Sequence, residues 1–375
     1  MIIVLESIYV KVALAAATLS SAYLLKRYEP IVSRLKRRLT SRLNFLDRNV
    51  AVFLGIRTVI PYVLPVKPGH IVLYGRTGSG KTNTAKLIAS SISRKVPVLI
   101  LDWAGEYELK GFKKLRPGVD LRINPLTPRT EDFSEHLDFL VDLFGDTYDF
   151  SEPQRYMFRN ALKVAFAKKK EPNLLDTLLV LDSMPPRSYY DNEIKMAIKR
   201  RLTQLTEGRV GKAFSSNSVS PEEIFESNVI LDLSVFRSIY SRKLFALLIL
   251  KMLYDYASST RGQREKLAHA TVIEEAWNII PYRRLDSKPT IGERLFAELR
   301  KYGECVIAVS QSPSETAWSI TKNARVVILH PSISKDARNM GLIDNEDRLE
   351  DLDIGEALII SNGKKRKVKI RLYNQ

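Results

Sequence analysis

The chain reads Gly75-Arg76-Thr77-Gly78-Ser79-Gly80-Lys81-Thr82 directly after the short apolar run Ile71–Tyr74. The glycines let successive backbone N–H groups converge on a phosphate, where any Cβ would obstruct the approach. A helix that begins at the end of such a loop adds its positive dipole end to the same anion site. This pattern between an apolar strand and a helix therefore predicts a phosphate-binding loop and an α/β fold.

The last two residues of this loop have distinct expected roles. Lys81 is expected to reach the β and γ phosphates of a nucleotide, and the Thr82 hydroxyl is expected to bind Mg²⁺. The guanine-reading pattern Asn-Lys-x-Asp does not occur in the sequence, so ATP is preferred over GTP as the ligand. The predicted nucleotide contacts are Gly75, Arg76, Thr77, Gly78, Ser79, Gly80, Lys81, Thr82 and Asn83.

An acidic pair follows another apolar run, Thr271–Ile273. Glu274 is expected to hold Mg²⁺ through its water shell, and Glu275 to orient and deprotonate the attacking water. The metal position usually holds Asp, and Glu is one methylene longer, so a weak or inactive ATPase is one alternative. The other alternative is that the two carboxylates only cap an exposed helix. Gln311 follows the run Val306–Val309 and is expected to sense the γ-phosphate.

Apolar runs and helical stretches alternate along much of the chain. Ile71–Tyr74 and Val98–Leu101 flank the helical stretch Lys81–Arg94, and this βαβ unit implies an α/β core with a mostly parallel sheet. Further elements are predicted as strands at Val229–Leu233, Ala270–Ile273, Val306–Val309 and Val326–Leu329, short strands within Val50–Val66, a helix at Arg242–Ala257 and a terminal hairpin within Glu356–Leu372 that turns near Asn362-Gly363.

A helical segment interrupts this alternation. Ser151–Gln154 offers a capping box with an early proline ahead of a long amphipathic stretch. We expect an all-helical subdomain at residues 131–227, inserted between two parts of the core at residues 49–130 and 228–375. The second part of the core contains the acidic pair and the terminal hairpin.

The N-terminal residues predict a membrane anchor. Residues 1–25 are mostly apolar and long enough to span a bilayer if Lys11 snorkels and Glu6 lies at the interface. Residues 26–48 hold eight basic side chains, a positive-inside pattern that predicts a single span in the cytoplasmic membrane and a cytoplasmic bulk. The alternatives are an amphipathic helix that lies on a membrane or partner, and a signal peptide, whose positive charge would precede its apolar core.

The chain is strongly basic, with a net charge of +17. This charge favours a polyanionic partner, either nucleic acid or an anionic membrane, although a basic surface also keeps a protein soluble. Lys199–Lys212 is the best candidate for contacts with DNA phosphates, and its alternative is a solvated helix face. Lys168–Lys170 is expected at a surface helix end, and Lys364–Lys367 on an exposed edge strand. The single cysteine, Cys305, lies in an apolar run and excludes a disulfide framework.

The order of these motifs resembles the HerA and FtsK superfamily of DNA-pumping ATPases, including its conjugation and type IV secretion branch. Trp277, where HerA proteins often have His, leans toward that branch, whereas Glu274 is a residue that HerA proteins tolerate at the metal position. The resemblance extends over about residues 50–372. It rests on the segments His70–Thr82, Leu101–Tyr107, Ile123–Leu126, Ile273–Trp277, Leu299–Gly303, Ser310–Pro313 and Gly355–Ala357.

The resemblance implies a RecA-like core and a homo-hexamer that hydrolyses ATP with Mg²⁺ to move DNA, which we expect to be double-stranded and bound without sequence preference. It also implies that Arg300 reaches the γ-phosphate of a neighbouring subunit; the alternative is an ordinary arginine on a helix surface. Asp102 and Glu106 match a family motif, and we expect them to shape their loop.

Together with the predicted anchor, the resemblance favours a DNA-transfer ATPase fixed at a membrane pore, as in conjugation or in CedB-like archaeal DNA import. The alternatives within the superfamily are a viral genome-packaging motor and a soluble DNA-repair motor of the HerA type. Alternatives of other kinds are a protein-secretion ATPase and a membrane scaffold that binds ATP but barely hydrolyses it.

Overall fold

A computed structural model describes residues 50–57, 60–128, 132–284 and 286–374. The predicted anchor at residues 1–25 and the basic segment at residues 26–48 lie outside the described residues. Within the described ranges, no helix combines the length and apolar character needed to cross a membrane. The chain from Ala51 onward forms one compact unit.

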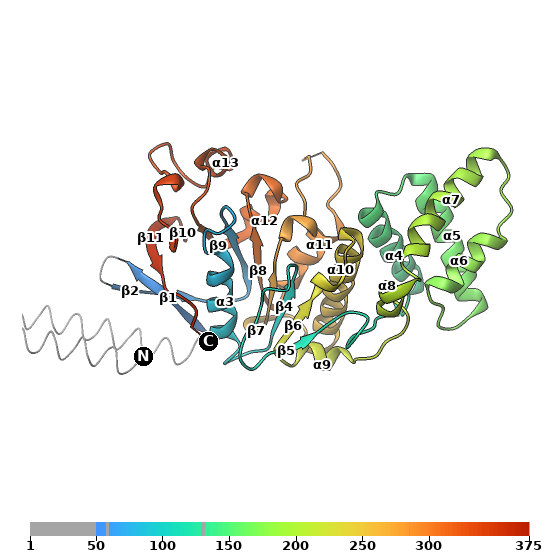
Figure 1. Ribbon diagram of the computed structural model, residues 1–375, viewed down its shortest axis with the longest axis horizontal. Coiled ribbons are helices and arrows are strands. Elements are labelled where there is room, and N and C mark those ends of the chain that lie inside the picture. Colours follow the sequence, from blue (N-terminus) through green and yellow to red (C-terminus); the bar gives the residue numbers. More distant parts are fainter. Residues whose placement is uncertain (1–49, 58–59, 129–131, 285, 375) are drawn as a thin grey trace, which may run out of the picture. The chain divides into compact units, whose positions relative to one another are not determined.

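Seven parallel strands form the larger part of an eleven-stranded sheet (Figure 1). Every residue of β3, β4 and β6 is buried, as expected for strands that are covered on both faces. The predicted α/β fold with a mostly parallel sheet is confirmed, and β5 is the one parallel strand that the sequence did not predict. In spatial order the seven are β9 (Ala324–Leu329), β3 (Gly69–Tyr74), β8 (Tyr302–Ser310), β7 (Arg264–Ile273), β4 (Val98–Asp102), β6 (Val229–Asp232) and β5 (Lys113–Leu115).

Four antiparallel strands extend the sheet beyond β9. The β10–β11 turn is Asn362-Gly363, with positive φ at both residues, as predicted for this hairpin. The prediction that Lys364–Lys367 lies at a sheet edge holds in part: β11 lies between β10 and β1, but among the described residues β1 pairs with β11 only at Lys369 and Ile370. The hairpin formed by β1 and β2 pairs with β11 of the C-terminal hairpin. The alternation of apolar and polar residues within a strand does not show which strand it pairs with. In spatial order the four are β10 (Glu356–Ser361), β11 (Lys364–Ile370), β1 (Ala51–Arg57) and β2 (Ile60–Pro65).

Helices of the core pack on this sheet. The P-loop helix α3 contacts β1, β3, β7 and β8, α11 contacts β8, and α12 contacts β3 and β9. α10 continues into a π-helical turn at Ala257–Arg261 before β7 begins. The two long helices predicted from the sequence are present, with ends close to those expected. The core helices are α3 (Lys81–Ile92), α10 (Ile239–Tyr256), α11 (Ile291–Leu299), α12 (Trp318–Asn323) and α13 (Ser334–Asn339).

The predicted helical segment lies between β5 and β6, and Figure 1 shows α4 to α7 gathered to one side of the sheet. The Ser151 N–H donates to Gln154 Oε1 at 2.9 Å, which is half of the predicted capping box. α5 ends at Lys168, and Lys168–Lys170 is exposed, as predicted. The helices are α4 (Phe133–Tyr148), α5 (Glu152–Lys168), α6 (Leu174–Ser183), α7 (Tyr189–Gln204), α8 (Gly208–Ala213) and α9 (Pro221–Phe225).

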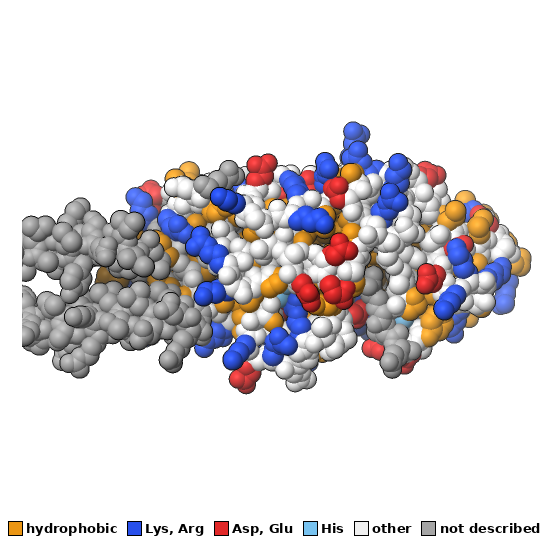
Figure 2. Space-filling view, turned by 90° about the horizontal axis from the view of Figure 1, so that it is seen from below, with side chains coloured by type: hydrophobic (Ala, Val, Ile, Leu, Met, Phe, Trp, Pro, Cys, Tyr) orange, Lys and Arg blue, Asp and Glu red, His pale blue; other side chains and the backbone are white. Residues whose placement is uncertain are grey.

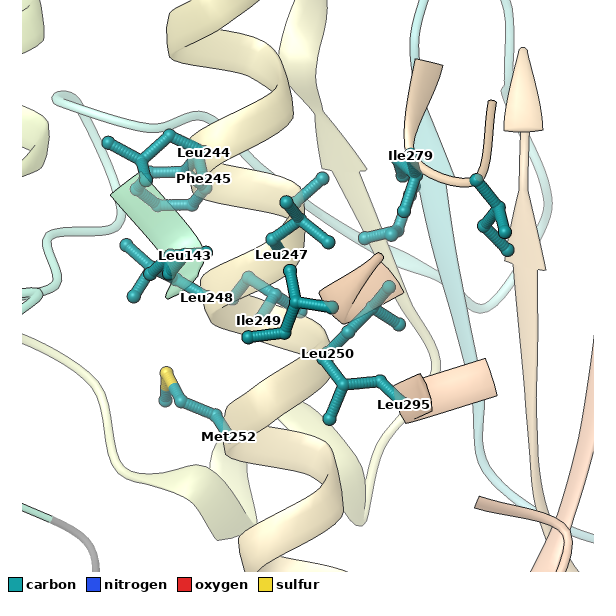
Figure 3. Packing of buried hydrophobic residues seen from close by; sticks show 14 of the residues in the cluster. Leu143, Leu244, Phe245, Leu247, Leu248, Ile249, Leu250, Met252, Ile279 and Leu295 are labelled. Carbon is teal, nitrogen blue, oxygen red and sulfur yellow. The ribbon is translucent and has the colours of Figure 1, made fainter. Parts of the chain in front are cut away.

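Helix α10 joins the helical segment to the core, and apolar neighbours surround it. Figure 3 shows Leu143 of α4 on one side of α10, and Leu295 of α11 and Ile279 on another. Every residue from Leu244 to Leu250 is buried, which a helix at the surface of a sheet does not show. Full burial of a leucine, isoleucine or phenylalanine contributes about 1.5–3 kcal/mol to folding. The helical segment and the sheet therefore share one hydrophobic core.

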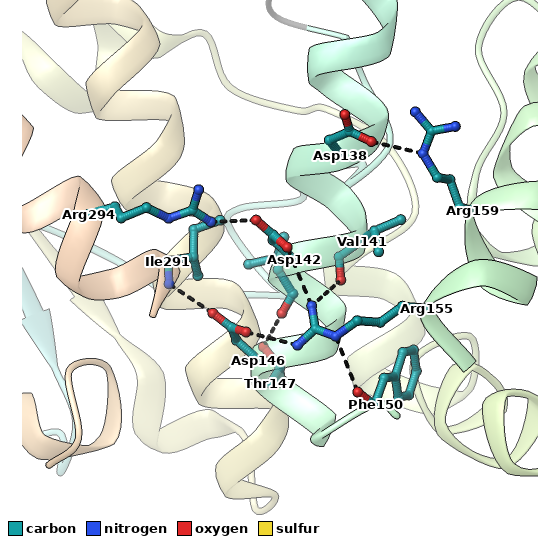
Figure 4. Close-up of polar contacts among 11 residues, drawn as sticks. Asp138, Val141, Asp142, Asp146, Thr147, Phe150, Arg155, Arg159, Ile291 and Arg294 are labelled. Carbon is teal, nitrogen blue, oxygen red and sulfur yellow. Dashed lines mark hydrogen bonds and ion pairs between the residues drawn. The ribbon is translucent and has the colours of Figure 1, made fainter. Parts of the chain in front are cut away.

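A polar cluster lies at the same junction (Figure 4). Arg155 of α5 donates to Asp146 of α4 at 3.1 Å, and the other Asp146 oxygen accepts the Ile291 N–H at 2.8 Å. Arg294 of α11 pairs with Asp142. A carboxylate at the first residue of a helix satisfies a free N–H group and interacts favourably with the helix dipole. The helical segment therefore fixes the start of α11.

Candidate nucleotide site

The carboxyl ends of the parallel strands bring most of the predicted site residues to one edge of the sheet. The P-loop follows β3, Glu274 follows β7, and Gln311 follows β8. Because β8 lies between β3 and β7, the Gln311 segment lies between the phosphate loop and the acidic pair. Ligands of open α/β sheets bind outside this edge. The order of the strands therefore assembles the site that the motifs predict.

The P-loop has a backbone that depends on its glycines. Gly78 and Gly80 have φ angles of 77° and 102°, in the region that residues with a Cβ rarely adopt. At Gly75, an added Cβ would lie 2.6 Å from the Cβ of His330, so no side chain fits there. The tip of the loop, Arg76–Gly78, is exposed. The loop is thus packed at its base and open where a phosphate would enter.

The Lys81 ammonium lies inside the loop. Its Nζ donates to the Gly75 carbonyl at 2.6 Å and to the Arg76 carbonyl at 3.0 Å. Burial lowers the pKa of Lys81, and the negative charges of Glu275 and Glu274 act in the opposite direction. The Lys81 ammonium is therefore close enough to the acidic pair for the charges of the two carboxylates to act on it.

Thr82 and Glu274 meet as the predicted magnesium site requires. Thr82 Oγ1 donates to Glu274 Oε1 at 3.3 Å. Both groups are hard oxygen donors of the kind that Mg²⁺ prefers, and Mg²⁺ completes its coordination with waters and substrate phosphates. These residues therefore fit a magnesium ion bound together with a nucleotide.

Tyr107, to which the sequence assigned no role, holds the other oxygen of Glu274. Its hydroxyl is fully buried and donates to Glu274 Oε2 at 2.6 Å. The Asp102 carboxylate accepts the backbone N–H groups of Gly105, Glu106 and Tyr107 at 2.8, 3.1 and 2.9 Å. Asp102 therefore shapes the loop after β4, in agreement with the expectation for it. Glu106 takes part in this loop through its backbone N–H and carbonyl, and the residue is exposed.

The environment of Glu274 disfavours its negative charge. Burial is the main cause and raises the pKa of Glu274 to about 7, with the charges of Glu275 and Asp102 acting in the same direction. The hydrogen bonds from Tyr107 and Thr82 to the carboxylate act in the opposite direction. The alternative that the acidic pair only caps an exposed helix is wrong for Glu274, because this side chain is buried.

Glu275 lies in a left-handed backbone conformation, with φ and ψ both at 48°. Its carboxylate accepts a hydrogen bond from the Trp277 indole N–H at 2.6 Å, and its residue is half-buried. Non-glycine residues in this conformation gather at functional sites. The turn directs two consecutive glutamates into different surroundings, one buried against Thr82 and one nearer to solvent.

His330 supports the P-loop from the end of β9, and no motif in the sequence pointed to it. Its Nε2 lies 3.0 Å from Thr84 Oγ1, and the neighbouring Pro331 carbonyl accepts the Arg76 N–H at 3.0 Å. Burial, together with the charge of Lys81, lowers the pKa of His330 to about 4, so the ring is neutral at physiological pH. Only the sheet order places the end of β9 beside the P-loop.

Gln311 lies beside the loop, whereas the Asn83 side chain is turned to another use. The Gln311 carbonyl accepts the Gly75 N–H at 3.1 Å, and the Gln311 residue is exposed. The Asn83 amide donates to the Arg371 carbonyl at 2.9 Å and accepts the Tyr373 N–H at 2.7 Å. The Asn83 side chain therefore fastens the C-terminal tail to α3, and the prediction that it contacts nucleotide has no support from its contacts.

Arg300 lies at the opposite edge of the sheet. It follows α11 directly before β8 begins, and it is exposed. Burial, aided by the charge of Arg300, lowers the pKa of His70 at the start of β3 to about 3. Because the P-loop follows the other end of β3, Arg300 takes no part in the nucleotide site of its own chain.

Comparison with known proteins gives a match to one family. A sequence profile described as the central domain of helicase HerA matches residues 58–253, which is more than half of the chain. The matched range includes the P-loop and Tyr107 and ends before the acidic pair. Proteins named DNA double-strand break repair helicase HerA, from Sulfurisphaera tokodaii and Saccharolobus solfataricus, are each 24% identical over 78% and 84% of this chain. The chain spans 62% and 65% of the length of these two relatives.

Solved structures share the fold. VirB4 of Thermoanaerobacter pseudethanolicus superposes with a TM-score of 0.66 at 16% identity, over 86% of this chain and 96% of that chain. The bacterial conjugative coupling protein TrwB gives a TM-score of 0.58 at 14% identity, over 86% of this chain and 89% of that chain. At such identities the likeness concerns the fold alone, which is a RecA-like P-loop fold. On the strength of the profile match, this protein belongs to the family defined by the central domain of the HerA helicase.

Proposed function

We propose that this protein is an ATP-driven motor that moves DNA. The observation that carries the proposal is the convergence of Lys81, Thr82, Glu274 and Glu275 at one edge of the sheet, with the Gln311 segment between the loop and the acidic pair. Membership in the HerA family supports the same function, since the curated relatives are named as DNA repair helicases.

The four side chains divide the chemistry of ATP hydrolysis. The phosphates of ATP would accept the hydrogen bonds that Lys81 gives to the loop carbonyls. Thr82 and Glu274 would hold Mg²⁺, which neutralises charge on the transferred phosphate. Glu275 would accept a proton from the attacking water, and such general base catalysis contributes about 10²–10⁴-fold. Gln311 would contact the γ-phosphate.

We infer that the motor is a homo-hexamer. Arg300 is exposed at the sheet edge opposite to the P-loop, so it can reach only the nucleotide of another subunit. In a ring, one edge of each subunit can face the nucleotide of the next. An arginine supplied in this way stabilises the negative charge that develops on the γ-phosphate.

The proposed DNA contacts are exposed basic residues of α7 and α8. Arg200, Arg209 and Lys212 are exposed, whereas Lys199 pairs with Asp182. Figure 2 shows that on one face of the molecule Lys and Arg side chains are spread among acidic ones and form no single stripe. The DNA contacts are therefore assigned from these two helices and not from the charge of that face. Phosphate contacts are independent of base sequence, so we propose double-stranded DNA bound without sequence preference.

Two settings for this motor have support. The apolar residues 2–25, followed by a basic segment, favour DNA transfer at a pore in the cytoplasmic membrane. The naming of the curated relatives favours a repair motor that acts on DNA without a membrane. Retention of the full-length chain in membranes through high salt and carbonate supports the first setting, and release supports the second.

ATP turnover by the full-length chain tests the function. We expect turnover that DNA stimulates at low salt, loss of nucleotide binding in Lys81→Ala, and turnover reduced by about 10²–10⁴-fold in Glu275→Gln with nucleotide binding retained. Absence of both DNA stimulation and DNA binding in the presence of ATP contradicts the motor. Undiminished turnover in Glu275→Gln contradicts the assignment of the base.

A further inference from the structure

We propose that Tyr107 is a positioning residue that aims the Glu274 carboxylate at the magnesium site, which allows a glutamate to serve where the shorter aspartate is usual. This inference rests on the proposed ATP hydrolysis at the same site. It assigns a role to a fully buried hydroxyl that no step of the hydrolysis described above uses.

The two oxygens of Glu274 are held from different sides. Tyr107 donates to Oε2 at 2.6 Å, and Thr82 donates to Oε1 at 3.3 Å. A glutamate side chain has one more rotatable bond than aspartate, so it loses more conformational entropy when it is held in one position. A short hydrogen bond from a rigid, buried phenol supplies this order before the metal binds. With Oε2 held by Tyr107, Oε1 is the Glu274 oxygen that faces Thr82 and would serve the magnesium ion.

Tyr107 is itself fixed to the strand and to the P-loop helix. Asp102, at the end of β4, binds three successive N–H groups of the loop that carries Tyr107. Lys86 of α3 lies over the Tyr107 ring, with its Nζ 5.4 Å from the ring centroid, and donates to the Glu106 carbonyl at 2.7 Å. Because α3 also carries Thr82, these contacts tie together the two elements that supply the magnesium ligands.

The variant Tyr107→Phe removes the hydroxyl and keeps the ring. The matched control is Tyr256→Phe, because the Tyr256 hydroxyl also donates to a glutamate, Glu226, and belongs to α10. We expect the Mg²⁺ concentration for half-maximal turnover to rise at least tenfold in Tyr107→Phe and to stay unchanged in Tyr256→Phe. Turnover at saturating Mg²⁺ should fall less than turnover at limiting Mg²⁺.

A binding measurement gives a readout that does not depend on turnover. The affinity for a fluorescent, non-hydrolysable ATP analogue is measured with Mg²⁺ and with a chelator. We expect Tyr107→Phe to reduce the gain in affinity that Mg²⁺ brings and to leave the affinity in chelator unchanged. A general loss of folding would lower both affinities together, so this ratio separates positioning from a structural defect.

A second variant, Glu274→Asp, sharpens the test. Aspartate is one methylene shorter than glutamate, so we expect the carboxylate in Glu274→Asp to lose its hydrogen bond from Tyr107. Adding Tyr107→Phe to Glu274→Asp should then raise the Mg²⁺ requirement no further. Equal Mg²⁺ requirements for Tyr107→Phe and Tyr256→Phe, or fully additive effects of Tyr107→Phe and Glu274→Asp, would overturn the positioning role. A wild-type chain that shows no Mg²⁺-dependent nucleotide binding would instead overturn the proposed function.

Discussion

Two adjacent residues, Glu274 and Glu275, show how one backbone angle separates two chemical roles. The left-handed conformation of Glu275 costs a residue with a Cβ about 1–2 kcal/mol. Hydrogen bonds on both sides offset this cost, since the Asn278 N–H donates to the Glu275 carbonyl at 3.0 Å and Trp277 donates to its carboxylate. The turn leaves Glu274 buried and Glu275 half-buried. In the proposed mechanism the first holds a metal, and the second meets water.

A buried histidine makes the fold sensitive to acid. The His70 ring stacks on Phe296 with 3.8 Å between centroids, and the pKa of His70 is lowered to about 3 by burial and by the charge of Arg300. In the unfolded chain the pKa of histidine is about 6.5, so the unfolded state binds more protons between pH 6.5 and 3. The free energy of unfolding is therefore unaffected by His70 well above pH 6.5 and decreases as the pH falls from 6.5 toward 3.

Urea unfolding at pH 6.5 and pH 5 measures this effect. At one and a half pH units below the unfolded pKa, His70 is expected to cost about 2 kcal/mol of unfolding free energy. About 0.4 kcal/mol of this cost is already present at pH 6.5, so the variant His70→Gln should lose about 1.6 kcal/mol less than wild type between pH 6.5 and pH 5, whatever its stability at pH 6.5. His330 titrates in both proteins, so its contribution cancels. If the unfolding free energies of wild type and His70→Gln depend equally on pH, His70 does not cause the loss of stability in acid.

At the level of elements, helix α11 lies between the turn that carries Glu275 and Arg300, the residue that we propose reaches a neighbouring nucleotide. It begins at Ile291, whose N–H is bound by Asp146 of the helical segment, and it ends at Leu299, directly before Arg300. Gly292 lets the helix approach that turn closely, because an added Cβ would lie 2.2 Å from the Ile279 carbonyl oxygen. The position of α11 is therefore fixed by backbone contact on one side and by the helical segment on the other.

The variant Gly292→Ala tests this close approach. Alanine normally stabilises a helix by about 1 kcal/mol relative to glycine, whereas overpacking against a backbone that cannot move costs about 1–3 kcal/mol. We expect net destabilisation in urea unfolding and reduced ATP turnover, because the turn that carries Glu275 is displaced.

Gly145→Ala in α4 is the matched control. An added Cβ at Gly145 would lie 2.2 Å from the guanidinium of Arg155, which is the end of a flexible side chain and can move at the cost of its hydrogen bonds to Asp142 and Asp146. Its cost should be smaller than that of Gly292→Ala, with turnover affected less. A Gly292→Ala protein that is as stable and as active as wild type would refute the close-approach argument.

The whole molecule carries a net charge of +17, and the proposed function gives that charge a location. Arg200, Arg209 and Lys212 are exposed on α7 and α8. Changing all three to alanine should weaken DNA binding and reduce the slope of log affinity against log salt by about 0.9 for each DNA phosphate that these side chains neutralise. Alanine at Lys168–Lys170 removes the same number of charges from the end of α5 and should change the slope little. Equal slopes for the two triple variants would exclude a DNA site on α7 and α8.

Several elements were predictable because their signals are local. The P-loop motif, the strand before it, α3 and the terminal hairpin follow from glycine positions and hydrophobic period over fewer than about 20 residues. The acidic pair was also visible, because two glutamates directly follow an apolar run. The apolar residues 1–25 are also a local signal and predict a membrane anchor, but these residues lie outside the described ranges.

Other features depend on contacts between distant parts of the chain. The sequence by itself determined the nucleotide loop, the α/β class and the candidates Glu274, Glu275 and Gln311. Only the tertiary structure decided that His330 supports the loop, that Asn83 binds the tail, and that β1 and β2 extend the sheet beyond β11. The physical reason is that strand order and the burial of a polar group are set by which segments pack together, and hydrophobic periodicity is the same for a strand at the edge or the centre of a sheet. Tyr107 illustrates the limit, since its role exists only because β7 brings Glu274 within 2.6 Å of its hydroxyl.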